Sequence, residues 1–539
     1  MPRQTGGEAV VQSLSSEGVK VIFGIPGTHG LALFDALHDN PGIRRIITRH
    51  EQGAAFMADG YARASGEVGV CLTATGPGVI NSLSAMGTAF IDSSPVLNIF
   101  TQIPSGDIGQ TKGYLHEVRD QLPLVADLTG WSARAESVSQ IPWLVRDAMG
   151  HMRNGRTTPT AIEVPRDILD SSGDAPALSS TPKVRDAGDT FQVSEAAEAL
   201  LQAKRPFIWA GGGVVSSQAS QELLELAELI EAPVFTTIMG IGSIPGNHPL
   251  HLGNRAINDS VQAYFDSCDM VLVVGSRFSH IETADLAMRL PKQIVRIDVD
   301  PAETGRNYPA NINVVGDAKI VLSQILDTFT AEQKSIKRAS RAGEVAELKG
   351  MVRSGLLNRS EEAVALFDEV VSVMPDDSII ANDVTTFAYW AWSLLEVKEP
   401  RKYLYPWGFG TLGFGMPAAL GAKVACPEKQ VLAVAGDGGF MFTATELATA
   451  VQFDINVVTL IVNDNCFGVL EPQQEARFGR TMMTKLKNPD FAAMARSFGA
   501  HGVCVDSIDK VGPALSEAFA LNKPSVVELK IDIPDPFDW

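Results

Sequence analysis

Short apolar runs alternate with longer segments of helical periodicity along most of the chain. The apolar runs of the first 170 residues are 21–24, 46–47, 69–73 and 96–99. Strands that alternate with helices in this way form parallel sheets covered by helices on both faces. The pattern therefore predicts a doubly wound α/β domain over residues 1–170.

The same alternation recurs in two further segments. It appears between residues 190 and 330 and again over 360–539. A polar stretch at 171–187 is expected to link the first two segments, and a charged helical stretch at 331–357 to link the second to the third. We therefore expect an α/β protein with three doubly wound parallel-sheet domains.

Length, charge and cysteine usage narrow the class of protein. A chain of 539 residues exceeds a single hydrophobic core and suits three domains of roughly 150 to 180 residues. The formal net charge of −19 argues against nucleic acid or an anionic membrane as a partner. No run of eighteen apolar residues and no apolar signal core occur. The five cysteines have no CxxC spacing, which suggests reduced thiols in a cytoplasmic protein.

One strand–helix–strand unit in the third segment carries a motif suited to phosphate and metal. Gly436-Asp437-Gly438-Gly439 follows one apolar run, and Asn463-Asp464 follows the next. Thr443 and Glu446 are expected to form a capping box at the start of the intervening helix. A crossover places the carboxyl ends of both strands at one sheet edge, where ligands bind. Asp437 and Asp464 would meet there as Mg2+ ligands, with glycine N–H groups near phosphate.

This motif resembles the diphosphate motif of thiamine diphosphate (ThDP) enzymes, in which Gly-Asp-Gly is followed, one helix later, by Asn-Asn. Here Asp464 replaces the second asparagine and adds a negative charge. The resemblance implies that Asp437 and Asp464 bind Mg2+ through their side chains and Cys466 through its carbonyl. It also implies cofactor contacts for the residues Gly436, Gly438, Gly439 and Asn463. The three domains match the family's order of pyrimidine-binding (1–170), central (190–330) and diphosphate-binding (360–539) domains.

Glu51, within Arg49-His50-Glu51-Gln52-Gly53, is the first candidate for catalysis. It follows a short apolar run and precedes an apolar helix, which predicts a poorly hydrated carboxylate. Such a carboxyl group can exchange protons near neutral pH. In the ThDP family a glutamate at this place bonds the pyrimidine ring, so the resemblance implies the same role. The alternative is an ordinary acid at a helix N-terminus.

A glycine-rich run at 408–417 and two histidines complete the candidate site. By resemblance, the Gly410 carbonyl accepts a hydrogen bond from the pyrimidine amino group, and Leu412 is the apolar wedge that bends the cofactor. His29 and His116 are candidates for proton transfer, because histidine titrates near neutral pH. The place of His29 resembles that of a catalytic histidine in benzaldehyde lyase, and the place of His116 resembles a region where decarboxylases of the family keep histidine or glutamine. Each could instead be a loop histidine bonded to the backbone.

The central domain raises the question of a flavin. Its segments 211–213, 236–240, 275–278 and 298–301 resemble those that cradle FAD in acetolactate synthase. Relatives with the same fold carry no nucleotide or a CoA-derived one. The resemblance therefore leaves bound FAD and a vestigial or empty nucleotide site both open.

The resemblance to ThDP enzymes leaves three possible reactions open. A decarboxylase would release CO2 from a 2-oxo acid and protonate the resulting enamine to an aldehyde; residues 49–53, 115–117 and 410–413 resemble guanidino-oxopentanoate decarboxylases. An acetolactate synthase-type carboligase would join the enamine to a second carbonyl compound, and the central domain and the region around Asp437 resemble that enzyme. A flavin-dependent oxidase of the same fold is disfavoured by Glu51, Asp437 and the Gly410–Leu412 loop together.

We expect the decarboxylase. Residues 467–473 lack the tryptophan that acetolactate synthases carry after their Asn-Asn motif, and 115–117 lack their Phe-Gln-Glu. The expected substrate is a small 2-oxo acid, with no nucleic acid or membrane partner. The resemblance also implies a homodimer or homotetramer with active sites at subunit interfaces, because Glu51 and Asp437 come from domains that belong to different subunits in the family.

Overall fold

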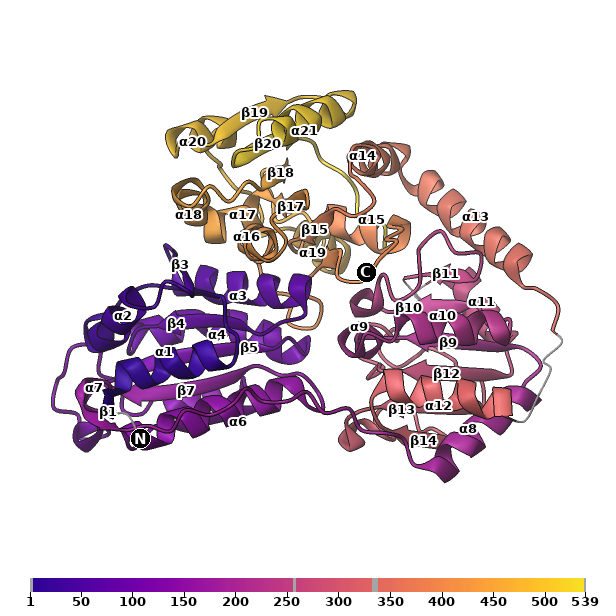
Figure 1. Ribbon diagram of the computed structural model, residues 1–539. Helices are drawn as coiled ribbons and strands as arrows, with labels where there is room; N and C mark the ends of the chain where they lie inside the picture. Colours follow the sequence, from indigo (N-terminus) through magenta and orange to yellow (C-terminus); the bar gives the residue numbers. More distant parts are fainter. Residues whose placement is uncertain (1–2, 255–257, 332–337, 538–539) are drawn as a thin grey trace.

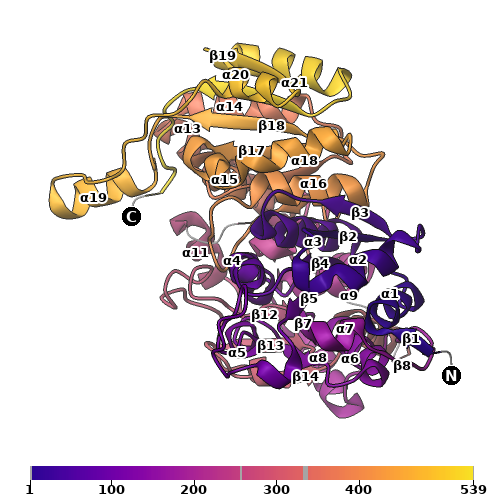
Figure 2. The same ribbon diagram turned by 90° about the vertical axis from the view of Figure 1, so that its left-hand side faces the viewer.

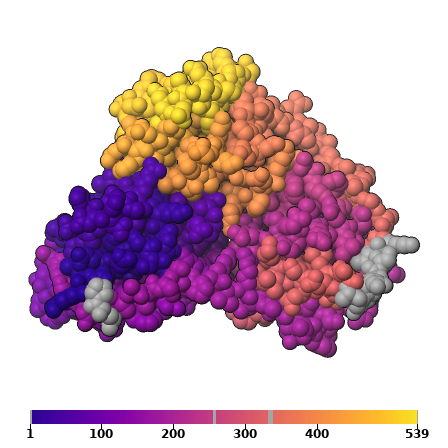
Figure 3. All heavy atoms as spheres, in the orientation of Figure 1, coloured from indigo at the N-terminus to yellow at the C-terminus, as the bar shows by residue number. Residues whose placement is uncertain are grey.

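The structure, a computed structural model, describes residues 3–254, 258–331 and 338–537. Three α/β domains lie at the corners of a triangle (Figures 1 and 3). Each domain is built on a six-stranded sheet whose paired neighbours all run parallel. This architecture confirms the three parallel-sheet domains predicted from the alternation of apolar runs and helical segments.

The first domain has the strand order β3-β2-β4-β5-β7-β6. These strands are β3 (Arg44–Ile47), β2 (Val21–Gly24), β4 (Gly69–Thr73), β5 (Val96–Gln102), β7 (Thr160–Pro165) and β6 (Trp131–Arg134). Helices α1 (Gly6–Ser16), α2 (Leu31–His38) and α6 (Ile141–Arg153) cover one face, and α3 (Glu51–Ser65) and α4 (Pro77–Ile91) cover the other. The short helices α5 (Leu122–Ala126) and α7 (Arg166–Asp170) complete the domain.

The polar stretch at 171–187 is not wholly a linker. Within it, β8 (Ser172–Asp174) pairs antiparallel with β1 (Arg3–Thr5). The pairing uses backbone groups alone, so side-chain composition gives no sign of it. The first residues of the expected linker therefore belong to the first domain.

The central domain has the strand order β11-β10-β9-β12-β13-β14. These strands are β11 (His251–Gly253), β10 (Val234–Thr236), β9 (Pro206–Ala210), β12 (Met270–Val274), β13 (Gln293–Asp298) and β14 (Ile312–Val315). Its helices are α8 (Thr190–Gln202), α9 (Gly212–Ser217), α10 (Ser220–Leu229), α11 (Asp259–Asp266) and α12 (Ala318–Ala331). The helical link expected over 331–357 is in part α13 (Ala342–Arg359), while residues 332–337 lie outside the described residues.

The third domain has the strand order β16-β15-β17-β18-β20-β19. These strands are β16 (Tyr403–Leu404), β15 (Ile379–Asn382), β17 (Val431–Gly436), β18 (Val458–Asn463), β20 (Ser525–Lys530) and β19 (His501–Val505). Its helices are α14 (Glu361–Ser372), α15 (Thr386–Leu394), α16 (Gly415–Ala425), α17 (Asp437–Thr443), α18 (Leu447–Gln452), α19 (Leu470–Phe478), α20 (Phe491–Ser497) and α21 (Val511–Ala520). Figure 2 shows α19 projecting from the body of the domain. No helix among the described residues is long and apolar enough to cross a membrane.

The predicted capping box at Thr443 and Glu446 is wrong. Helix α17 begins at Asp437, directly after β17, and ends at Thr443. The Thr443 hydroxyl donates to the Gly413 carbonyl oxygen at 2.9 Å. The Glu446 carboxylate accepts from backbone N–H groups of the first domain and not from the backbone of its own segment. Long-range partners therefore occupy both side chains that the local spacing suggested for a cap.

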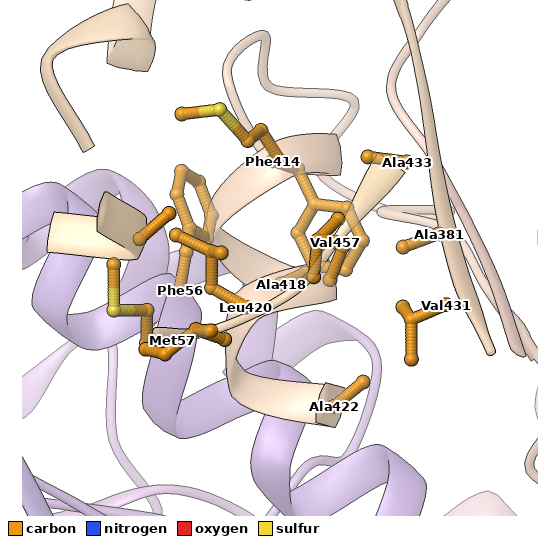
Figure 4. Close-up of a cluster of buried hydrophobic side chains, with 14 of the residues drawn as sticks. Phe56, Met57, Ala381, Phe414, Ala418, Leu420, Ala422, Val431, Ala433 and Val457 are labelled. Atoms are coloured by element: carbon orange, nitrogen blue, oxygen red, sulfur yellow. The ribbon is translucent and has the colours of Figure 1, made fainter. Parts of the chain in front are cut away.

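The first and third domains share one hydrophobic core, formed where α3 crosses α16 (Figure 4). The rings of Phe56 and Phe414 meet edge to face with centroids 5.5 Å apart. A Cβ atom at Gly60 would lie 2.0 Å from a carbonyl oxygen of α16, and one at Gly421 would lie 1.9 Å from a carbonyl oxygen of α3. The two helices thus touch backbone to backbone, which requires glycine at both crossing points.

Candidate active site

Two acidic side chains meet at the carboxyl edge of the third sheet. Asp437 follows β17 and Asp464 follows β18, and these strands are parallel neighbours. Burial is the main cause that raises the pKa of Asp464 to about 7, and the nearby Asp437 carboxylate adds to it. Burial likewise raises the pKa of Asp437. Two desolvated carboxyl groups so close together indicate a place for a cation.

Amide and backbone groups complete this edge. The Asn488 side-chain amide donates to Asp437 and lies 3.4 Å from the Asn463 amide oxygen. The Cys466 backbone N–H donates to Asp464 Oδ1 at 2.8 Å, which fixes the turn after β18. Carboxylate, amide and carbonyl oxygens are the donors that Mg2+ takes together with phosphate. Asp437 and Asp464 therefore supply donors of the kind that Mg2+ takes, and the metal role of these two residues and of Cys466 stays a prediction.

The glycine-rich loop that precedes α16 is held by a buried acid. Asp383, which follows β15, accepts from the backbone N–H groups of Gly413 (3.0 Å), Gly415 (3.1 Å) and Val384 (2.8 Å). It is fully buried, and burial raises its pKa to about 6. A Cβ atom at Gly439 would lie 3.2 Å from the same carboxylate. Asp383 thus ties the loop to the start of α17.

The other end of that loop is fastened to the first domain. Asp92 accepts from the Trp407 N–H at 3.0 Å and from the Gly408 N–H at 2.8 Å. The guanidinium of Arg63, itself buried, pairs with Asp92 at 3.0 Å and with Asp59 at 2.8 Å. Gly410 follows at φ +63°, with no atom within 4 Å of the position of a Cβ. The loop therefore holds Gly410 at a fixed, open position, and Leu412 follows it, partly buried.

Glu51 is the first residue of α3 and is partly buried. The Asn81 side-chain amide donates to Glu51 Oε2 at 3.0 Å. The His50 ring accepts from the Gln52 N–H at 3.2 Å and caps the helix instead of joining Glu51.

The two candidate histidines lie together. Their ring centroids are 6.0 Å apart, with the planes at 78°. His29 is buried, and its pKa is lowered by burial and, to a smaller extent, by His116 and Arg166. Buried Gln121 fixes the loop beside His116, because it accepts from the Gly76 N–H at 2.8 Å and donates to the Thr101 carbonyl oxygen at 2.6 Å. The structure thus unites two residues whose sequence positions gave no sign of contact.

A cavity of about 470 Å3 lies where the three domains meet, and the segments suspected of binding FAD line part of it. Gly212, Gly213, Thr237, Ser276 and Asp298 are among its lining residues. The cationic side chains Lys183, Arg277 and Arg401 also line it. None of these three forms an ion pair with an acid among the described residues. The volume suits a nucleotide, and the lining carries acids such as Asp298 and Glu303 as well as these cations.

Three family models match successive parts of the chain. The N-terminal TPP-binding domain of thiamine pyrophosphate enzymes matches residues 4–124, the central domain 193–325 and the C-terminal TPP-binding domain 383–529. The chain belongs to the thiamine pyrophosphate enzyme family. Its three sheets are the N-terminal, central and C-terminal domains of a ThDP-dependent enzyme.

Relatives of this ThDP enzyme carry two kinds of name. A probable acetolactate synthase large subunit of Methanocaldococcus jannaschii is 37% identical, over 98% of this chain and 92% of its own. A probable 2-ketoarginine decarboxylase AruI of Pseudomonas aeruginosa is 35% identical, over 98% and 94%. Acetolactate synthase isozyme 3 large subunit of Escherichia coli is 31% identical, over 96% and 92%. The protein is thus a decarboxylase or acetolactate synthase-like member of the family.

Sequence analysis missed several residues that support the site of this ThDP enzyme. Asp383 follows a buried strand just as Asp437 and Asp464 do, so the same reasoning could have found it. Asn81 and Asp92 gave no comparable signal. Their partners lie 30 and 315 residues away in the chain, and only the folded structure brings them together.

Proposed function

We propose that the protein is a ThDP- and Mg2+-dependent decarboxylase that converts a small 2-oxo acid to an aldehyde. The observation that carries this proposal is the contact between His29 and His116. Aldehyde formation requires a proton at the carbon that CO2 leaves, and a histidine pair at neutral pH is suited to supply it. Bound ThDP supplies the carbon nucleophile and the electron sink for loss of CO2.

The proposed cofactor site divides between two regions. Mg2+ would be held by the carboxylates of Asp437 and Asp464 and by the Cys466 carbonyl. The backbone N–H groups of Gly438 and Gly439, together with Gly436 and the Asn463 side chain, would bind the diphosphate. The Gly410 carbonyl and the Leu412 side chain would contact the rings, and the Glu51 carboxyl group would serve to exchange a proton with the pyrimidine.

The histidines divide the proton chemistry between them. Burial keeps His29 neutral near pH 7, so it is suited to accept a proton as well as to relay one. His116, at the partly exposed end of the pair, exchanges protons with solvent. The relative named as a 2-ketoarginine decarboxylase supports this reaction class.

We further propose that active sites form between two copies of the chain. Apolar side chains are exposed beside both Glu51 and Asp437. Ile80, next to Asn81, is 45% exposed, and Phe442, within α17, is 55% exposed. Helix α19 has no buried residue in its own chain. A second subunit would cover these surfaces, and light scattering of the purified protein tests for a dimer or tetramer.

An acetolactate synthase-type carboligase is the second candidate, supported by relatives that carry that name. In that reaction a second carbonyl compound, rather than a proton, meets the carbon that CO2 leaves. FAD bound in the three-domain cavity would favour the carboligase, and the cavity carries unpaired cations suited to the phosphates of FAD. Absorbance near 450 nm of the purified protein tests for the flavin.

The test is a panel of 2-oxo acids, from pyruvate to branched, aromatic and guanidino side chains, supplied with ThDP and Mg2+. The proposal expects one aldehyde for each CO2 released. Release of CO2 with a carboligation product and no aldehyde would overturn it in favour of the carboligase. His29→Ala and His116→Ala should each slow aldehyde formation by about 10²-fold or more. His38→Ala, which removes an exposed histidine, is the matched control and should leave the rate unchanged.

A further inference from the structure

A segment of the third domain, residues 446–453, lies against the turn between β3 and α3 of the first domain. Glu446 is 0% exposed, although it carries a carboxylate. It stands at the end of the short turn that follows α17. None of the cofactor contacts proposed above involves it, so this buried acid is unexplained by the proposed function.

The Glu446 carboxylate is fully occupied by hydrogen bonds. Oε1 accepts from the Arg49 N–H at 3.0 Å and from the His50 N–H at 2.8 Å. Oε2 accepts from the Thr449 hydroxyl at 2.6 Å and lies 3.2 Å from the Arg49 N–H. Two of the three donors are thus the peptide N–H groups immediately before Glu51.

Gly53 makes room for this carboxylate. A Cβ atom at Gly53 would lie 2.3 Å from Glu446 Oε1, so any other residue there would displace the carboxylate. Because α3 begins at Glu51, the Glu446 carboxylate also lies at the positive end of the helix dipole. The first turn of α3 is therefore shaped around an anion that another domain supplies.

Other contacts in the same interface do not touch these two N–H groups. The Arg49 guanidinium donates to Gln452 Oε1 at 2.6 Å. The Arg44 guanidinium lies 3.5 Å from the Phe453 carbonyl oxygen. These side-chain contacts hold the surfaces together, whereas Glu446 binds the two backbone N–H groups that lead into Glu51.

We propose that Glu446 is a positioning residue for Glu51. The orientation of the Glu51 side chain depends on the two peptide groups before it, and Glu446 binds both of their N–H groups. Loss of the carboxylate would let the first turn of α3 rotate or fray, and a misplacement of about 1 Å can cost about 10²-fold in rate. This inference rests on the proposed function, in which Glu51 exchanges a proton with the cofactor.

Glu446→Gln tests the proposal. The amide removes the negative charge that faces the positive end of α3, and an NH2 group in the place of Oε2 can no longer accept from the Arg49 N–H. We expect kcat to fall about 10- to 100-fold, with the KM for the 2-oxo acid and the Kd for ThDP little changed. Hydrogen exchange at the thiazolium carbon of bound ThDP, followed by NMR, should slow by the same factor. Gln452→Ala, which removes a bond of the same interface, should leave exchange and kcat within about twofold.

Three further comparisons make the outcome decisive. The double variant Glu446→Gln with Glu51→Gln should exchange no more slowly than Glu51→Gln alone, because one residue acts through the other. Thr449→Val should slow exchange less than Glu446→Gln, and it serves if the latter does not fold. Any of three results would overturn the inference. These are a wild-type exchange rate in Glu446→Gln, effects of the two substitutions that multiply in the double variant, and a loss of activity that weaker ThDP binding explains. Failure of the wild-type protein to catalyse exchange would instead refute the proposed function.

Discussion

Replacing Asp464 by asparagine, the residue of the family motif, should make the affinity for Mg2+ less dependent on pH, because one titrating group is lost from the metal site. Burial and the neighbouring Asp437 raise the pKa of Asp464 to about 7. A metal ligand must be deprotonated, so below this pH the cation has to displace a proton. At pH 6 about nine tenths of the Asp464 side chains would carry that proton. The wild-type affinity for Mg2+ should therefore fall about tenfold between pH 8 and pH 6 from this group alone.

Calorimetry of Mg2+ binding to the protein in the presence of excess ThDP measures this effect. The same titration in two buffers of different ionisation enthalpy counts the protons released. Phosphate groups of the cofactor titrate in the same range, so the informative quantity is the ratio of wild-type to Asp464→Asn affinity. That ratio should fall about tenfold from pH 8 to pH 6, and the wild-type protein should release about one more proton at pH 6. A ratio that does not change with pH would refute the reasoning.

Three other predictions concern cofactor binding and stability. Asp437→Ala should abolish Mg2+-dependent ThDP binding, and an unchanged affinity by calorimetry would contradict its assigned role. Phe414→Ala, which empties a fully buried site against Phe56, should cost about 3 to 5 kcal/mol in urea unfolding, and a loss below about 1 kcal/mol would contradict the shared core. Burial lowers the pKa of His251 to about 4 from 6.5. The unfolded chain therefore takes up a proton first on acidification, and stability should fall by up to about 3 kcal/mol as the pH drops from 6.5 to 4. His251→Gln should remove this dependence.

The elements and sheets of this protein could be predicted well because the relevant signals are local. The strand at 69–73 is read from its apolar run alone, and β4 has the same bounds. The start of α17 could not be read in this way. Glu446 has the spacing of a cap, but its carboxylate binds N–H groups 396 and 397 residues away, and nothing in the local sequence shows this.

The candidate site shows the same division. Asp437 and Asp464 are predictable, because parallel strands bring their carboxyl ends to one edge regardless of packing detail. The contact between His29 and His116 depends on how two loops fold over each other. It is set by the hydrogen bonds of Gln121, whose partners come from two further segments of the chain. Such loop geometry is not encoded in periodicity.

The shared core of the first and third domains has a consequence for synthesis of the chain on the ribosome. The α3 surface that packs against α16 is complete once Ser65 is made, but α16 begins only at Gly415. Translation proceeds at roughly 5 to 20 residues per second, so the apolar face of α3 would stay uncovered for on the order of 20 to 70 s before α16 is made. An apolar surface exposed for that time is one to which chaperones can bind. The glycines at the crossing let α3 and α16 approach each other closely. A helix with a larger side chain at the crossing could not pack as closely against α3, so the crossing favours α16 as its partner.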